Sequence, residues 1–106
     1  MINCTCIVQE GQHPDQSKAK LQRTLNHFTK TAFAEEAQIA WIPVAGGNGF
    51  TAGEPSTSSI VSITANAPLT TDRRESLLRE LVEIWTDEVR CSVDEIVAVI
   101  ADPQQN

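Results

Sequence analysis

The chain has 106 residues, of which 41% are hydrophobic and 21% charged, a composition typical of one globular domain with a single core. It carries 8 Lys and Arg residues against 14 Asp and Glu residues, so its formal net charge is −6. A field of this sign repels nucleic-acid phosphates and anionic membranes. The longest apolar run, Ile96 to Ala101, is far shorter than the roughly 20 residues that a membrane span needs. We therefore expect a cytoplasmic protein with no nucleic-acid partner and no membrane partner.

The first half of the chain predicts a strand, a helix and a second strand. Ile2 to Val8 is short and rich in β-branched residues, which favours a strand. A helix is predicted from Asp15 to about Phe33, because apolar residues recur at spacings of four, three and four, at Leu21, Leu25, Phe28 and Ala32. Ile39 to Val44 predicts the second strand, and Pro43 confines it to a sheet edge or a bend because proline cannot donate to the ladder.

The second half repeats this order after a glycine-rich connection from Ala45 to Ser58. Ser59 to Ala65 predicts a third strand, and Ile96 to Ala101 predicts the last one. The second helix is predicted from Asp72 to about Arg90, with Asp72 and Glu75 at the spacing of a capping box. Its apolar stripe consists of Leu78, Leu81, Val82, Trp85 and Val89.

The two halves match each other at a shift of 57 residues without a gap. This shift superimposes Asp15 on Asp72, Leu21 on Leu78, Leu25 on Val82, Phe28 on Trp85, Ala32 on Val89 and Ile39 on Ile96. A helical crossover of this length joins parallel strands, so each half is interpreted as a β-α-β unit. We predict a single α/β domain over 1–106, made of two β-α-β repeats at about 1–45 and 58–103. Together they form one four-stranded sheet with two helices on one face.

The alternation of side chains along the strands assigns one face of the sheet to the helices. Under the 57-residue shift the apolar positions of the first strand match those of the third: Cys4, Cys6 and Val8 match Val61, Ile63 and Ala65. The opposite face is mixed, and parallel strands are rarely left open to water. Another copy of the chain is the economical cover for that face, so we expect a closed oligomer.

A doubled β-α-β unit with a strand at the amino terminus resembles the tautomerase superfamily. Branches of that family include 4-oxalocrotonate tautomerase, macrophage migration inhibitory factor, malonate semialdehyde decarboxylase and cis-3-chloroacrylate dehalogenase. The order of elements is most similar to the dehalogenase branch, from Pro43 through the loop Ala45 to Phe50 and Gly53, then Ser59 to Ala65, the second helix and Asp94-Glu95-Ile96. The resemblance implies a homotrimer whose sheets line a central barrel.

The resemblance also implies where a catalytic group would lie. In the family, a proline exposed at the amino terminus serves as a general base near neutral pH, because its surroundings lower the pKa of its secondary amine. The matching position here is Ile2. A bulky Ile normally prevents removal of the initiator Met, so the implied terminal group is the primary amine of Met1. The catalytic position therefore falls on Met1 and Ile2, and the proline is missing.

The remaining family positions concern the binding of a small carboxylate or 2-oxo acid. Of the two arginines that hold the substrate carboxylate in the dehalogenase branch, one matches Arg73 and the other matches Thr70. Arg74 is a partial substitute for the second. A family histidine matches Thr29, and a family tyrosine falls near Val99. Arg73 is therefore both a catalytic and a substrate-binding candidate.

Simpler interpretations accompany these assignments. Arg73 and Arg74 could pair only with Asp72, with Glu75 or with a neighbouring subunit. Three cysteines are an odd number, and two cysteines two residues apart on one strand face favour buried free thiols over a disulfide. No cofactor or metal is expected, since the glycines of the connection do not precede a helix and no cluster of His and Cys residues is visible.

Two functional hypotheses follow from the sequence. The first is a tautomerase-like isomerase that acts on a small 2-oxo acid, with an activity weakened or lost because the amino-terminal proline is absent. The second is a non-catalytic homotrimer that binds small anions or partners. Ile2 favours the second hypothesis, whereas Arg73 favours the first.

Overall fold

The computed structural model describes residues 1–9, 15–45, 48, 50–51, 54–55, 58–89 and 95–103. These residues form two long helices and six strands, two of which are very short. In chain order the elements are β1 (Ile2–Gln9), α1 (Asp15–Phe33), β2 (Ala37–Val44), β3 (Phe50–Thr51), β4 (Glu54–Pro55), β5 (Ser59–Thr64), α2 (Thr71–Val89) and β6 (Ile96–Ala101).

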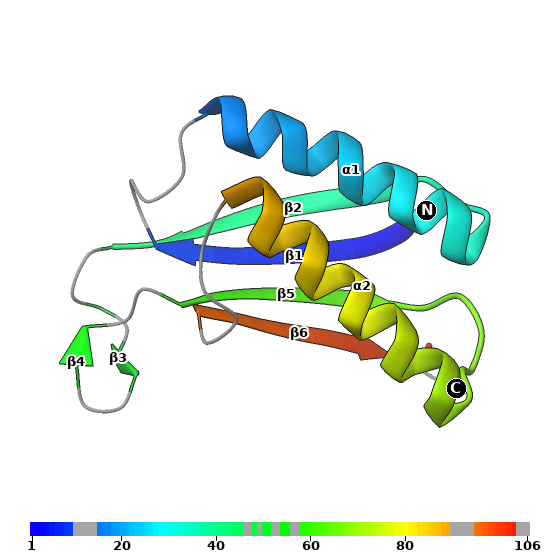
Figure 1. Cartoon of the computed structure of the whole chain (residues 1–106). Helices are drawn as coiled ribbons and strands as arrows, with labels where there is room; N and C mark the ends of the chain where they lie inside the picture. Colours follow the sequence, from blue (N-terminus) through cyan, green and yellow to red (C-terminus); the bar gives the residue numbers. More distant parts are fainter. Residues whose placement is uncertain are drawn as a thin grey trace.

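Four strands form one sheet in the order β2-β1-β5-β6. The strand pairs β1·β2 and β5·β6 are parallel, and the central pair β1·β5 is antiparallel. Both helices lie side by side over the same face of this sheet (Figure 1). The predicted fold of two β-α-β units is therefore confirmed, and β2, which carries Pro43, is an edge strand as predicted.

The core lies between the sheet and the two helices. Every second residue of β1 is buried there: Ile2, Cys4, Cys6 and Val8. From β5 the core receives Val61 and Ile63, and Ala65 is buried directly after this strand. The sheet face predicted to meet the helices is thus the buried one. Trp85 of α2 is fully buried and packs on Trp41 of β2, with ring centroids 6.2 Å apart.

The second helix is rotated slightly from its predicted orientation. Its buried residues are Leu77, Leu81 and Trp85, whereas Leu78 and Val82 are only half-buried. The helix begins one residue before the predicted start, and its N-cap is Thr70, whose Oγ1 accepts a hydrogen bond from the Arg73 N–H at 3.2 Å. The capping box assigned to Asp72 and Glu75 was therefore wrong, because the threonine two residues earlier already satisfies an orphan amide of the first turn.

The gapless shift of 57 residues also fails in detail. The shift holds for β1 and β5. The buried Leu21 and Leu25 of α1, however, correspond to Leu77 and Leu81 of α2, so the shift between the helices is one residue smaller. In the parallel ladders Ile2 pairs with Ala37, while the matching residue Ser59 pairs with Ile96. The shift that relates β2 to β6 is therefore larger than the shift that relates β1 to β5. A comparison without gaps cannot represent this difference.

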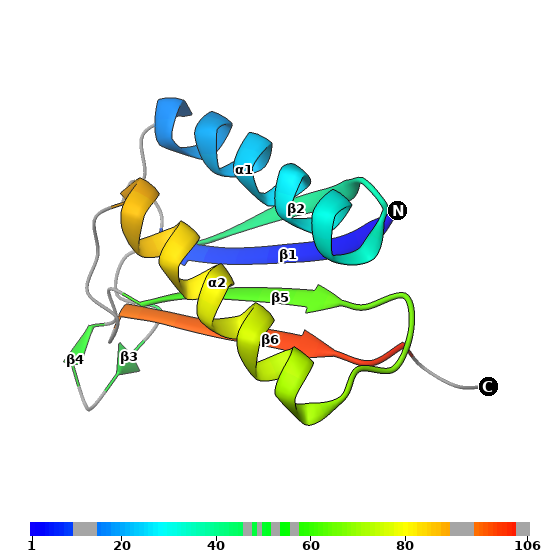
Figure 2. The ribbon, with the colours of Figure 1, turned by 45° about the vertical axis from the view of Figure 1, so that its right-hand side comes forward.

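The glycine-rich connection contains a short antiparallel hairpin that the sequence analysis missed. Phe50 pairs with Pro55, and Thr51 pairs with Glu54. Strands of two residues show no hydrophobic period, so nothing in the pattern could reveal them. The hairpin lies at the end of the sheet opposite the amino terminus (Figures 1 and 2). The glycines of this connection lie outside the described residues.

The turn between α1 and β2 depends on an unusual backbone conformation. Ala34 has a φ of 59°, and its N–H donates to the carbonyl of Lys30 at 3.0 Å. A left-handed residue after the last turn ends a helix by satisfying one of its free carbonyls. The chain then reverses toward the sheet, and Glu35 is placed beside the start of β1. Neither helix is long and apolar enough to cross a membrane, as far as the described residues extend.

Candidate functional site

The sheet topology brings the predicted site positions to one end of the molecule. Strand β1 starts at this end, and the antiparallel β5 and the parallel β6 both finish there. The amino terminus, the turn after β5 and the first turn of α2 therefore lie at the same end (Figures 1 and 2). Met1, Thr70, Arg73 and Arg74, which are far apart in sequence, share this end of the sheet.

The two candidate residues at the amino terminus have different environments. The Ile2 side chain is 2% exposed and belongs to the core, and its backbone N–H donates to the carbonyl of Glu36 at 2.8 Å. Met1 is 69% exposed. The nitrogen of Ile2 is an amide already engaged in a hydrogen bond, so the Met1 amine is the basic nitrogen at this end.

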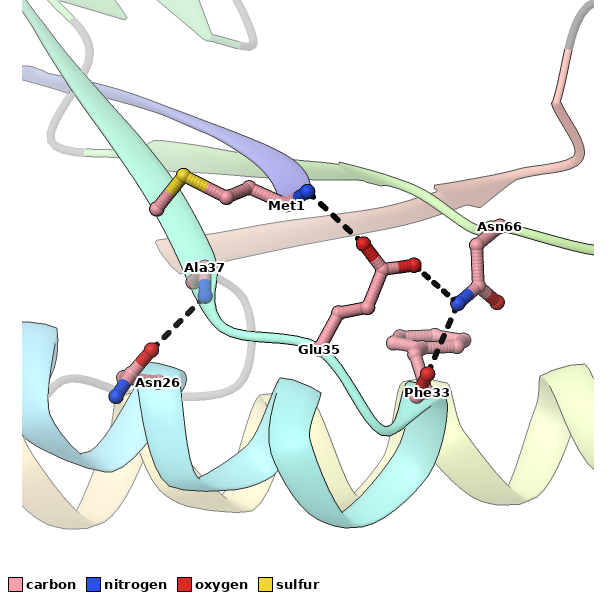
Figure 3. A network of polar contacts seen from close by, with 6 residues as sticks. All are labelled: Met1, Asn26, Phe33, Glu35, Ala37 and Asn66. Carbon is pink, nitrogen blue, oxygen red and sulfur yellow. Dashed lines mark hydrogen bonds and ion pairs between the residues drawn. The ribbon is translucent and has the colours of Figure 1, made fainter.

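A polar network holds the Met1 amine in place (Figure 3). The amine forms an ion pair with Glu35 Oε1 at 2.9 Å. The other oxygen of Glu35 accepts a hydrogen bond from Asn66 Nδ2 at 2.6 Å, and Asn66 also donates to the carbonyl of Phe33 at 2.9 Å. The Asn66 side chain and the Met1 ammonium hold the pKa of Glu35 below its ordinary value. The network thus joins the start of β1, the turn after α1 and the turn after β5.

Sequence reasoning missed Glu35 and Asn66 entirely. They are separated by 31 residues, and neither belongs to a recognisable motif. Their contact depends on the left-handed Ala34 and on the antiparallel pairing of β1 with β5. No local signal in the sequence could have assigned them to the site.

The first turn of α2 carries the predicted carboxylate ligands. Thr70 uses its side-chain oxygen to cap the helix, and its carbonyl accepts the N–H of Arg74 at 2.9 Å. Arg73 is exposed, and no ion pair joins it to any residue in the described ranges. A guanidinium suits the two oxygens of a carboxylate, so Arg73 is open to a ligand from solution.

Arg74 differs from Arg73 because a carboxylate of the chain already holds it. Its Nη2 pairs with Asp102 Oδ1, just after β6, and the backbone N–H of Leu69 donates to the same oxygen at 3.1 Å. Arg74 and the Leu69 N–H hold the pKa of Asp102 below its usual value. The simpler interpretation of Arg74 as an ion-pair partner therefore applies, but the partner is Asp102, whereas Glu75 pairs with Arg79 at 2.6 Å.

The other sequence candidates do not join this site. Thr29 is fully buried and donates from its hydroxyl to the carbonyl of Asn26 at 3.1 Å. Val99 lies exposed on the sheet face away from the helices. His27 is exposed on α1. His13 and Cys91 lie outside the described residues.

Cys4 and Cys6 are free thiols inside the core, as predicted, with their sulfur atoms 4.0 Å apart. The hydrogen bond to Cys4 and burial together raise the pKa of the Cys6 thiol. A protonated thiol inside the core is a poor nucleophile. Within the described ranges no group of three or more His, Cys, Asp or Glu side chains is arranged to hold a metal ion.

Among the described residues, three shallow hollows of about 410 to 470 Å³ lie along the helices, and neither Met1 nor Arg73 lines any of these three. The largest lies between α1 and β2. Another hollow lies between α2 and β6. It is lined by Glu75, Leu78, Arg79, Val82, Glu83 and Ala98. The third hollow is lined by α2 alone and includes Asp72 and Glu75 near the start of this helix. The site candidates Met1, Thr70, Arg73 and Arg74 line none of the three.

Comparison of the sequence with models of known protein families and with curated proteins gives no match. Solved structures do match in three dimensions. A fused 4-OT in a wild type symmetric trimer has a TM-score of 0.83 at 15% identity, covering 95% of this chain and 85% of that chain. Pt0534 inactivated by 2-oxo-3-pentynoate has a TM-score of 0.83 at 16% identity, with coverages of 95% and 85%. N1, a member of the cis-3-chloroacrylic acid dehalogenase family, has a TM-score of 0.80 at 14% identity, with coverages of 95% and 74%.

These likenesses establish the fold of the chain. The fused 4-OT and N1 structures each match 95% of this chain at TM-scores of 0.83 and 0.80. The chain therefore has the tautomerase fold, as the sequence predicted. At identities of 14 to 16% the similarity concerns the backbone architecture and assigns no activity to this chain.

Proposed function

We propose that the chain is a tautomerase-superfamily protein that binds a small 2-oxo acid and isomerises it slowly between its keto and enol forms. Arg73 binds the carboxylate, with help from Arg74, and the Met1 amine moves the proton. Thr70 contributes by capping the turn that carries both arginines. The observation that carries this proposal is the position of the amine and the arginine turn at one end of the sheet.

The substrate class is supported by the chemistry of the turn and by one structural neighbour. An exposed guanidinium without a carboxylate partner in the described part of the chain suits a small acid. Pt0534, which has the same fold, is inactivated by 2-oxo-3-pentynoate. A 2-oxo acid combines the carboxylate that Arg73 would bind with a carbonyl that acidifies the adjacent carbon.

Enolisation needs a base that removes a proton from the carbon next to the carbonyl, while the carbonyl oxygen takes up a proton from water. Ketonisation reverses both transfers: the enol oxygen loses its proton to water, and the protonated base returns a proton to the carbon. The Met1 ammonium must leave its ion pair with Glu35 and release a proton to water before it can accept the proton of the substrate. The terminal group is also a primary amine, one residue before the position of the family's proline. Both features make the proposed isomerisation slow.

The assembly that we propose is a homotrimer. On the sheet face away from the helices, Ile42, Ile7, Ile60 and Val97 are neighbours across all four strands, and we call them the apolar row. Ile42, Ile60 and Val97 are 46, 38 and 49% exposed in the single chain. A continuous apolar row of this kind favours burial against another subunit, and fused 4-OT, which has the same fold, forms trimers.

Substitution of Arg73 tests the binding part of the proposal. Calorimetry with phenylpyruvate should detect binding by the native protein, and Arg73→Ala should weaken it by about 1.5 to 3 kcal/mol, the range for a hydrogen bond to a charged group. Arg79→Ala is the matched control, because Arg79 is an exposed arginine of the same helix that pairs with Glu75. Absence of binding by the native protein, or equal losses in both variants, would reject this site.

A second candidate function is a non-catalytic trimer that keeps only the anion site. The burial of Ile2 favours it, because the position of the family's base is filled by a core side chain. Binding of phenylpyruvate without any turnover would support this candidate over the isomerase. The expectation of a cytoplasmic location stays a prediction in both cases.

The variant Ile2→Pro separates the two candidates further. Proline allows removal of Met1 and exposes a secondary amine, so we expect ketonisation of phenylpyruvate to rise by about 10²- to 10⁴-fold, the usual contribution of a general base. Ile2→Ala is the control, since it also allows removal of Met1 and loses core volume but leaves a primary amine. If the native protein already turns over phenylpyruvate and Ile2→Pro does not raise the rate, the base lies elsewhere.

A further inference from the structure

Asp102 lies where the carboxylate of a ligand would bind Arg74. Its Oδ1 accepts hydrogen bonds from two donors that belong to different parts of the same turn, the Arg74 side chain and the Leu69 backbone N–H. We infer that Asp102 competes with the carboxylate of the ligand for Arg74 and so sets the affinity of the site for small acids. This inference rests on the proposed function, in which the arginine turn binds a carboxylate.

The two donors form a small cradle for one carboxylate oxygen. Arg74 and Asp102 are 28 residues apart in sequence, so the contact depends on the end of β6 meeting the start of α2. An external carboxylate presents the same chemical group as the Asp102 side chain and would make the same two contacts. Only one carboxylate oxygen can occupy the cradle at a time, which makes the two mutually exclusive.

The contact is weak enough to be displaced. The side chains of Arg74 and Asp102 are 30 and 43% exposed, so water reaches the pair. Ion pairs with this degree of exposure shift an equilibrium by up to about fivefold. A ligand already held by Arg73 would therefore exchange its second carboxylate oxygen for Asp102 at a modest cost in affinity.

The neighbouring arginine shows what release of Asp102 would change. Arg73 has no ion-pair partner among the described residues, whereas Arg74 is held. With Asp102 in place, the turn offers one free guanidinium to a ligand. With Asp102 displaced, it offers two guanidinium groups and the Leu69 N–H.

Chemical labelling of arginines tests whether Asp102 shields Arg74. Phenylglyoxal modifies accessible guanidinium groups, and peptide mass spectrometry measures the rate at each arginine. In the native protein Arg74 should react more slowly than Arg73, and Asp102→Asn should accelerate Arg74 alone. The control is Asp72→Asn, which removes an equal charge from the same helix turn. Equal rates at Arg74 in the native protein and in Asp102→Asn would overturn the inference.

Calorimetry with phenylpyruvate tests the competition itself. Asp102→Asn should bind about two- to fivefold more tightly than the native protein, the range expected for release of an exposed ion pair, and Asp72→Asn should gain less. Measurable but equal binding by the native protein and Asp102→Asn would overturn this inference alone. Binding by neither protein would overturn the proposed function, and the inference with it. If Asp102→Asn does not fold, Asp102→Ser keeps an acceptor for the Leu69 N–H and replaces it in both measurements.

Discussion

At the scale of single residues, the structure changes the meaning of Ile2. The sequence presents it as a substitution at a catalytic position, whereas the structure places its side chain in the core and engages its N–H with Glu36. A buried β-branched residue in a central strand stabilises the sheet by packing and by its ladder hydrogen bonds. Ile2 is thus a structural residue at the position where the resemblance implied a base.

The ion pair of Met1 with Glu35 predicts a dependence of stability on pH. Asn66 and the amine hold the pKa of Glu35 below its ordinary value. A carboxyl group with a lowered pKa stabilises the fold at pH values above its unfolded pKa, and this contribution is lost as the pH falls through its folded pKa. Glu35→Gln should therefore lower the thermal midpoint at about pH 7 and should have a much smaller effect near pH 3.

Thermal unfolding of the native protein and Glu35→Gln at both pH values measures this difference. Glu36→Gln is the control, because it removes an exposed charge from the next residue, which pairs with Lys30 rather than with the amine. A midpoint difference that stays the same at both pH values would show that the Glu35 charge does not stabilise the amino terminus.

At the scale of elements, the helix α2 shows how strongly packing selects among apolar residues. The sequence contains two overlapping apolar stripes on this helix, one with Leu77, Leu81 and Trp85 and one with Leu78, Val82 and Val89. Only the first stripe is fully buried. The Thr70 cap determines where the helix begins, and contacts with the sheet determine which stripe faces inward.

Alanine substitutions in the two stripes of α2 measure this selection. Leu81→Ala should destabilise the fold by about 2 to 5 kcal/mol, the range for a fully buried leucine. Leu78→Ala is the matched control and should lose about 1 kcal/mol, because its side chain is half-buried. Urea unfolding at one protein concentration gives both free energies. A larger loss of unfolding free energy for Leu78→Ala than for Leu81→Ala would mean that the helix turns the stripe with Leu78 inward.

At the scale of the whole molecule, both described helices cover the same face of the sheet, and no described residue covers the other face with a helix. The polarity of the uncovered face changes along the strands. The apolar row lies near the β3–β4 hairpin, and polar residues such as Asn3 and Gln38 lie near the amino terminus. A trimer would bury the apolar row and cover the sheet face that the single chain exposes.

Insertion of a charge into the apolar row tests the trimer. Light scattering should give three times the chain mass of 11.6 kDa for the native protein at micromolar concentration, and Ile60→Lys should shift the mass toward that of a monomer. A lysine buried against a second copy loses hydration without a partner, and the contact also loses the isoleucine, worth about 1.5 to 3 kcal/mol when fully buried. Gln22→Lys adds the same charge on exposed α1 and should leave the mass unchanged. A native protein with monomer mass would exclude the trimer.

Taken by itself, the sequence determined the order of the two helices and of the four strands of the main sheet, the bounds of α1 and β6, and the helix-facing side of β1. These features depend on local periodicity, since alternation along a strand and spacing along a helix report burial directly. It also indicated the arginine turn, because Arg73 and Arg74 follow one another in the chain. Only the tertiary structure decided their different states, because Asp102 follows β6 and lies 28 residues after Arg74 in the chain. The tertiary structure likewise decided the contact of Glu35 with Asn66 and the Met1 amine. Periodicity leaves a pattern in a single sequence, whereas contacts between distant residues leave none.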